Sequence, residues 1–219
     1  MTEIMPQLIP AILTKDPSEV EEKIRFLEGI PEITDVQIDF ADGKFVPNET
    51  AMPKELFGLE TRLYLEAHLM TRHPQYYFHD LENLGARTIF LHHESQHSVH
   101  ELLTAVKNVK ALGPRVGLAI SPHTEASAFD PFINEIDVAM ILGVNPGWQG
   151  QKFLPETLER VADLRKRHSG VIIEVDGGVS LENIESIAAH GADRIVVGSA
   201  IWQTADPKKT IQKFLKKIR

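Results

Sequence analysis

The sequence predicts an α/β fold in which a single (β/α)8 barrel, a TIM barrel, takes up residues 1–219 as one domain. Two observations predict it. Eight short apolar runs typical of strands alternate with helix-containing connections, and polar side chains recur where several of these runs end. Eight strand-and-helix units close a parallel barrel, and 219 residues is the length of a compact one. A doubly wound open sheet uses the same alternation and is the structural alternative.

The elements follow from the spacing of apolar residues along the chain. The predicted strands are 7–13, 33–40, 63–70, 88–92, 115–120, 138–142, 171–176 and 194–197. The predicted helices are 16–27, 74–84, 99–111, 155–167, 181–189 and a basic final helix over 208–219. We expect every strand to be followed by a connection that contains helix, as the barrel requires.

Composition excludes several classes of function. The net charge of -8 argues against nucleic acid or an anionic membrane as the main partner. The chain has no cysteine, so disulfides, thiolate metal sites and a thiol nucleophile are ruled out. The apolar run over 8–13 is too short for a signal-peptide core or a membrane span. We therefore expect a soluble, cytoplasmic protein.

The stretch over 34–48 contains the first residue with a chemical role to explain. Val36, Ile38 and Phe40 alternate with Gln37 and Asp39, so the two polar side chains lie on the opposite side of the strand from the apolar ones. A carboxylate that faces inward near the end of a buried strand costs free energy unless it is paired. Asp39 is therefore a candidate functional residue.

Other polar residues are expected at the same end of the barrel. Asp39, His68 and Asp176 come from three different strands, and all lie near a strand's C-terminal end. Chemistry in TIM barrels occurs at that end, so three titratable groups meeting there indicate an active site.

Glycine-rich turns follow the last strands. Glycine lets the backbone approach an anion closely, and barrels often bind phosphate at the loops after strands seven and eight. A third such loop follows strand six. The pattern predicts a phosphate site at Gly177, Gly178, Gly198 and Ser199, flanked by Gly147 and Gly150.

Several longer motifs resemble those of the ribulose-phosphate 3-epimerase family, in order from Pro10 to Ile201. They are Phe45-Val-Pro-Asn48, His68-Leu-Met70, His92-x-Glu94-x-x-His97, Val144-Asn-Pro-Gly147, Gly150-Gln-Lys-Phe153, Glu174-Val-Asp-Gly-Gly-Val179 and Val197-Gly-Ser-Ala-Ile201. The resemblance implies a barrel of the ribulose-phosphate-binding type that takes a ketose phosphate.

The resemblance also implies a reaction and roles for particular residues. Family members interconvert D-ribulose 5-phosphate and D-xylulose 5-phosphate by moving the C3 proton through an enediolate. Asp39 and Asp176 match the two acid–base residues. With His68, which also matches a substrate-binding position, they match the ligands of a divalent metal such as zinc, manganese or iron. Dimers or hexamers of the chain are implied by resemblance as well.

The chain departs from the family pattern near the reacting end. Gln37 occupies the position of a fourth metal ligand, a histidine, and a neutral amide oxygen binds zinc less well than imidazole, so we expect metal binding to be weakened or absent. Ala11 stands where the family has serine, Ala41 where it has a pocket methionine, and Gln149 where it has a loop glycine; a further methionine is absent near Leu142.

Three interpretations follow from these departures. The chain is an epimerase of a pentulose phosphate with altered metal binding, an epimerase of a larger ketose phosphate such as a hexulose 6-phosphate, or a sugar-phosphate-binding protein without turnover. Retention of Asp39, His68 and Asp176 favours catalysis, because a pure binder gains nothing from buried unpaired carboxylates.

Two remaining features are interpreted by resemblance. His92 and Glu94 match residues that support the pocket, which we prefer to a separate metal site with His97 and His100. Trp148 either covers the site or packs against the protein; the sequence does not distinguish these roles.

Overall fold

The computed structural model describes residues 5–219, which form a closed barrel of eight parallel strands in the order β1 to β8. Residues 1–4 of the predicted domain lie outside the described residues. The strands are β1 (Gln7–Ile12), β2 (Asp35–Ala41), β3 (Tyr64–Met70), β4 (Ala86–His92), β5 (Arg115–Ile120), β6 (Val138–Leu142), β7 (Ile172–Asp176) and β8 (Arg194–Val197). Pairing of β1 with β8 closes the barrel, so the open sheet is excluded and the barrel prediction is confirmed.

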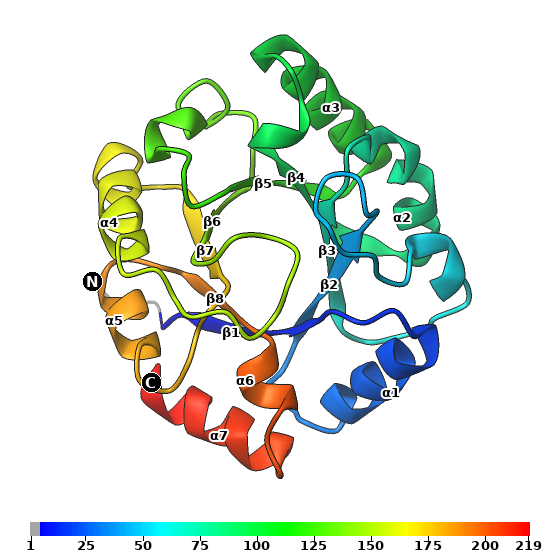
Figure 1. The fold of residues 1–219 in the computed structure, drawn as a ribbon, viewed down its shortest axis with the longest axis vertical. Coiled ribbons are helices and arrows are strands. Elements are labelled where there is room, and N and C mark those ends of the chain that lie inside the picture. The colour runs from blue at the N-terminus through cyan, green and yellow to red at the C-terminus, as the bar shows by residue number, and fades with distance from the viewer. Residues whose placement is uncertain (1–4) are drawn as a thin grey trace.

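Helices surround the barrel, as Figure 1 shows. They are α1 (Pro17–Glu28), α2 (Phe78–Leu84), α3 (Val99–Leu112), α4 (Thr157–Arg167), α5 (Ile184–Ala189), α6 (Ser199–Trp202) and α7 (Pro207–Lys217). Local sequence explains where several begin. The Asp16 side chain accepts a hydrogen bond from the Ser18 N–H at the start of α1, and Ser98 accepts one from the Glu101 N–H at the start of α3.

Two details of the predicted elements are corrected. The connections after β2 and β5 contain only the single-turn 3-10 helices η1 (Pro53–Leu56) and η4 (Ala126–Phe129) among their helical elements. The predicted helix over 74–84 is divided into η2 (Pro74–Tyr76) and α2, which begins after Tyr77. A one-turn helix is too short to show a repeat of apolar residues. The spacing of apolar residues therefore could not predict the one-turn helices or show where η2 ends and α2 begins.

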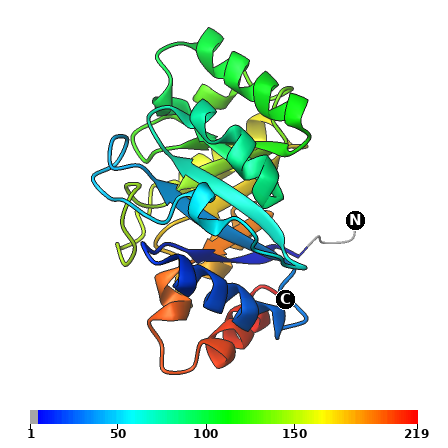
Figure 2. The same ribbon diagram turned by 90° about the vertical axis from the view of Figure 1, so that its right-hand side faces the viewer.

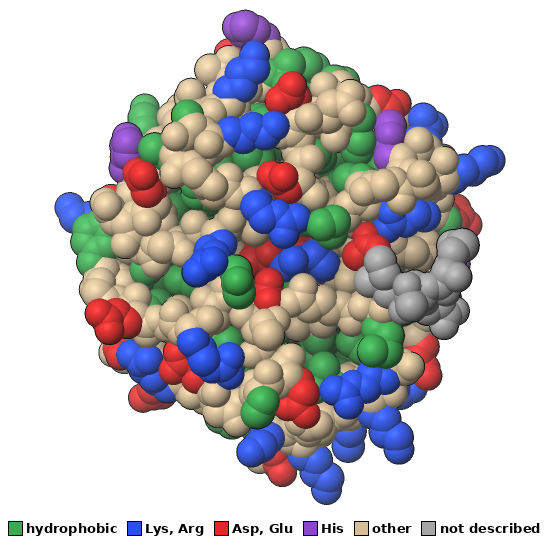
Figure 3. Space-filling view, turned by 180° about the vertical axis from the view of Figure 1, so that it is seen from behind, with side chains coloured by type: hydrophobic (Ala, Val, Ile, Leu, Met, Phe, Trp, Pro, Cys, Tyr) green, Lys and Arg blue, Asp and Glu red, His purple; other side chains and the backbone are tan. Residues whose placement is uncertain are grey.

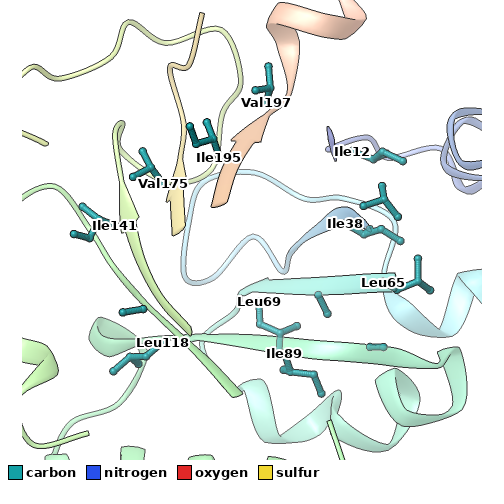
Figure 4. Close-up of a cluster of buried hydrophobic side chains, with 14 of the residues drawn as sticks. Ile12, Ile38, Leu65, Leu69, Ile89, Leu118, Ile141, Val175, Ile195 and Val197 are labelled. Carbon is teal, nitrogen blue, oxygen red and sulfur yellow. The ribbon is translucent and has the colours of Figure 1, made fainter. Parts of the chain in front are cut away.

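The main hydrophobic core lies between the strands and the surrounding helices. Every strand contributes outward-facing aliphatic side chains to it, among them Ile12, Ile38, Ile89, Leu118 and Ile195, which Figure 4 shows around the barrel. Their strand neighbours therefore point inward, which sets the composition of the barrel interior.

The inside of the barrel is chemically divided. Around Phe90 of β4 and along β5 and β6 it is apolar, with Val138 and Met140 also buried there. On β2, β3, β7 and β8 most inward-facing side chains are polar or charged and buried, namely Asp35, Gln37, Asp39, Glu66, His68, Glu174 and Arg194. Such a polar interior requires internal pairing partners, and these partners define the site.

The two ends of the barrel differ. The loops after β2 and β6 project from the same end, on the left in Figure 2, and the loop after β6 crosses the barrel centre in Figure 1. The opposite face carries acidic and basic side chains next to one another, including near its centre (Figure 3). Among residues 5–219, no helix is both long and apolar enough to cross a membrane.

Candidate active site

A pocket opens at the C-terminal ends of the strands. Its lining includes every site residue that the sequence predicted apart from Gln37: Asp39, His68, Gly147, Gly150, Asp176, Gly177, Gly178, Gly198 and Ser199. Gln37 lies directly beneath the pocket and is fully buried. The structure thus brings together residues from β2, β3 and β7 and from the loops after β6, β7 and β8.

Asp39 and Asp176 face each other across the mouth of the barrel, and two side chains connect them. His68 Nδ1 lies 2.9 Å from Asp39 Oδ1 and 3.4 Å from Asp176 Oδ2. The Gln37 side-chain amide nitrogen lies 2.9 Å from Asp39 Oδ1 and 3.0 Å from Asp176 Oδ2. The β2–β3 register places Asp39 beside His68, whereas Asp176 arrives from the far side of the barrel.

Burial and pairing together set the charges of this group. Burial raises the pKa of Asp39, the hydrogen bond from His68 opposes that rise, and the nearby negative charge of Asp176 adds to it. Burial alone would lower the pKa of His68, but hydrogen bonds to Asp176 and Asp39 and their charges outweigh it and raise that pKa to about 10. His68 is therefore an imidazolium that contacts both Asp39 and Asp176.

A chain of hydrogen bonds extends behind His68. Its Nε2 lies 2.8 Å from His92 Nε2, and His92 Nδ1 lies 3.4 Å from Glu94 Oε2. Burial lowers the pKa of His92, so His92 is neutral and accepts from the His68 Nε2–H. Its own Nδ1–H then donates to Glu94.

Glu94 anchors the outer end of this chain. Burial opposes its ionisation, but hydrogen bonds from His92 and Thr124 and from the Ser121 backbone N–H, at 2.8 Å, outweigh that effect and lower the pKa of Glu94 to about 2. Sequence reasoning predicted His92 and Glu94 as supporting residues; the loop after β5, which supplies two of the donors, gave no sequence signal.

The loops after β2, β6 and β7 meet at the pocket. A side chain in place of Gly177 or Gly178 would displace neighbouring atoms. A Cβ on Gly178 would lie 2.6 Å from the backbone nitrogen of Phe153, and one on Gly177 would lie 2.5 Å from a Val144 methyl; both glycines have positive φ. The Asn48 side chain donates to the Gly147 carbonyl at 2.7 Å and fixes the loop after β6. The two glycines thus allow the loops after β6 and β7 to pack together.

Some pocket residues differ from what the sequence predicted. Ala11 and Leu142 line the pocket, but Ala41 packs with Val46 and Met70 instead of lining it. Gln149 was missed as a functional candidate: its amide nitrogen would lie only 3.0 Å from a Cβ on Gly198, so its side chain reaches the predicted phosphate end. Trp148 lies on the pocket rim and is 54% exposed.

A second polar group lies deeper in the barrel and was also missed. Arg194 donates from Nε to Glu174 at 2.7 Å and from Nη2 to Asp35 at 3.2 Å, and it contacts Glu66. Burial raises the pKa of Glu66 to about 7 and that of Glu174 well above its usual range, despite Arg194. The sequence contained a signal for the two glutamates. Each stands two residues before an inward-facing site residue, so each faces inward as well.

The site fits a divalent metal through three of its side chains. Asp39, His68 and Asp176 each offer one ligand atom, and these atoms all lie within 4.8 Å of one another; no other such group occurs among residues 5–219. Carboxylate and imidazole together suit zinc, manganese or iron. Gln37 does not fit as a fourth ligand in the orientation seen, because it presents an N–H donor.

The fold and this pocket define a TIM-barrel protein with paired acid–base groups and glycine-lined loops at the C-terminal ends of its strands. The family model described as "Ribulose-phosphate 3 epimerase family" matches residues 7–202. The chain belongs to the ribulose-phosphate 3-epimerase family, a family of isomerases.

Individual relatives agree with this assignment. The ribulose-phosphate 3-epimerase of Aquifex aeolicus is 33% identical over 217 residues, which cover 96% of each chain. That of Escherichia coli K12 is 34% identical over 215 residues, 94% of this chain and 93% of the relative. A crystal structure of KGPDC from Streptococcus mutans superposes with a TM-score of 0.69 at 14% identity, covering 98% of this chain and 97% of that one, which shows the shared fold.

Proposed function

We propose that this chain interconverts D-ribulose 5-phosphate and D-xylulose 5-phosphate by moving the proton at C3. The observation that carries the proposal is the opposed pair of Asp39 and Asp176, whose facing oxygens share the donors His68 Nδ1 and Gln37 Nε2. Inversion at one carbon needs a base on one face and an acid on the other, and carboxylates from β2 and β7 can supply both.

The proton balance is simple. One carboxylate takes the C3 proton, and the electron pair of the C–H bond moves toward the C2 carbonyl to give an enediolate. The opposite carboxylic acid returns a proton to the other face of C3. A raised pKa makes the ionised form of Asp39 a stronger base than an exposed aspartate. In the metal-free site, the His68 imidazolium would place positive charge beside Asp39 and Asp176, where the enediolate would develop.

The glycine loops are proposed to hold the phosphate group. Gly177, Gly178, Gly198 and Ser199 line the pocket, and the loops after β7 and β8 are a common phosphate site in barrels. Binding there would leave the sugar carbons extending toward Asp39 and Asp176, which line the same pocket.

A divalent metal would be held by Asp39, His68 and Asp176, and when bound it would stabilise the enediolate oxygens as a Lewis acid. We propose zinc, manganese or iron as this metal, with an affinity that is weakened because Gln37 does not supply a fourth ligand. A dimeric or hexameric assembly and a cytoplasmic location also stay predictions, the first of which size-exclusion chromatography with light scattering would test.

The proposed reaction is tested by following solvent deuterium into substrate carbon by NMR. Purified protein in D₂O with ribulose 5-phosphate should place deuterium at C3, and hexulose 6-phosphates run in parallel test the sugar's length. Asp39→Asn and Asp176→Asn should each abolish exchange, whereas Asp163→Asn on α4, partly exposed in an ion pair with Arg167, should not. Wild-type exchange in either active-site variant would overturn the assignment. Binding of the sugar phosphate without any exchange would favour a binding protein.

A further inference from the structure

Gln37 is a buried side chain of the site whose placement the proposed reaction does not explain. It is fully buried on β2, two residues before Asp39, and its single amide nitrogen contacts a carboxylate on each side of the barrel. The contact to Asp176 joins residues 139 positions apart in the chain. An atom lying 2.9 and 3.0 Å from two carboxylate oxygens must be a donor, so these contacts fix which end of the amide faces the site.

The other end of the amide shows what determines this orientation. Gln37 Oε1 is buried and has no hydrogen-bond partner within the described part of the chain. Turning the amide over would point that oxygen at two carboxylates, which repel it, so the carboxylates hold the amide as it is. The amide is thus oriented by Asp39 and Asp176 and not by any partner of its own carbonyl group.

Two carboxylates that share a small buried space repel each other and need something positive or donating between them. A divalent cation would meet this need by charge; in its absence His68 Nδ1 and the two N–H groups of the Gln37 amide meet it by hydrogen bonding. A cation would be held by the same two carboxylates that the amide contacts, and an N–H group cannot ligate a cation.

We propose that Gln37 is a positioning residue that takes over the cation's structural role, holding Asp39 and Asp176 in register without a bound metal and competing with any cation that enters. Proton exchange at C3 then survives chelation, and removal of the amide makes exchange depend on added metal. The exchange readout rests on the proposed epimerase function, whereas the metal-binding and amide readouts described below do not.

The variants are chosen to separate donation from ligation. Gln37→Leu keeps much of the volume and removes both N–H donors, and Gln37→His substitutes a metal-ligating imidazole. Thr157→Val is the matched control, because Thr157 is equally buried, carries an unpartnered oxygen and begins α4 outside the pocket. Circular dichroism establishes that each variant is folded before it is compared.

Metal binding is measured first, by calorimetric titration of chelator-treated protein with zinc alone and by elemental analysis after dialysis. We expect Gln37→His to bind zinc at least about tenfold more tightly than wild type, the range typical of a changed metal-site residue. Gln37→Leu, which lacks the competing donor, should also bind more tightly than wild type, and Thr157→Val should match wild type. Wild-type protein that retains one zinc after chelator treatment would overturn the proposal.

Two further readouts complete the test. With chelator present, C3 exchange should be retained by wild type and by Thr157→Val, and lost by Gln37→Leu until zinc is added. Wild-type exchange rates for chelated Gln37→Leu would overturn the proposal. In ¹H–¹⁵N spectra, the side-chain NH₂ of Gln37 should be protected from solvent exchange in metal-free protein; a rapidly exchanging NH₂ would contradict the bridging role. If no protein form exchanges C3, the epimerase function fails, and the zinc and amide results still decide the role of Gln37.

Discussion

The charge on Glu94 gives a stability prediction whose size and pH dependence both follow from the structure. Glu94 accepts hydrogen bonds from His92, Thr124 and the Ser121 N–H, and its pKa lies at about 2 against an ordinary value of 4.5. The perturbation is Glu94→Gln, which keeps the shape and removes the charge. We expect the variant to unfold at lower denaturant concentration.

The magnitude follows from linkage between protonation and folding. Each pKa unit corresponds to about 1.4 kcal/mol, so the full shift corresponds to about 3 kcal/mol. A glutamine can still accept from Ser121 and Thr124, so we expect a loss of about 1–2 kcal/mol at pH 7. Because the folded pKa is depressed, this stabilisation is fully present above pH 4.5 and is lost as the pH falls toward about 2.

The assay is urea unfolding of wild type and Glu94→Gln at pH 7 and at several values down to about pH 3, inside the window that the two pKa values define. The difference in unfolding free energy should shrink steadily below pH 4.5. Glu22→Gln, on the exposed face of α1, is the control and should show little difference at any pH. A difference between wild type and Glu94→Gln that stays the same across this pH range would refute the electrostatic account of this position.

Two further predictions concern glycines. Gly117→Ala would put a Cβ 2.1 Å from the Phe90 ring inside the barrel and should cost about 1–3 kcal/mol or more by urea unfolding, while Gly170→Ala, with open space around it, should not; equal stability of the two would contradict this packing. Gly178→Ala should weaken inorganic phosphate binding at least about tenfold by calorimetry. Gly58→Ala introduces strain at a similar positive φ outside the pocket and should leave phosphate binding unchanged. Unchanged phosphate binding in Gly178→Ala would show that the loop after β7 is not part of the phosphate site.

Much of the fold could be predicted from the sequence because barrel strands leave a local signal. Outward aliphatic residues alternate with inward polar ones, as at Ile38 beside Gln37 and Asp39, and this period of two fixes which residues enter the barrel. All eight strands were predicted to within a few residues, and the predicted pocket residues meet at one end because parallel strands share their direction.

The remainder depends on contacts between distant segments. No local pattern shows that the Gln37 amide would reach Asp176, or that Gln149 would reach Gly198 from the loop after β6. Glu66 and Glu174 were readable as inward-facing residues, but their common partner Arg194 becomes apparent only when the barrel closes. The one-turn helices after β2 and β5 were missed because a single turn has no repeat to detect.

The central claim is that Asp39 and Asp176 act on opposite faces of C3, and early labelling in D₂O tests it most directly. With two bases, the first xylulose 5-phosphate formed from ribulose 5-phosphate should carry deuterium at C3, while the remaining ribulose 5-phosphate keeps its original proton. Deuterium that appears in ribulose 5-phosphate before any xylulose 5-phosphate forms, or product that retains the original proton, would contradict the account.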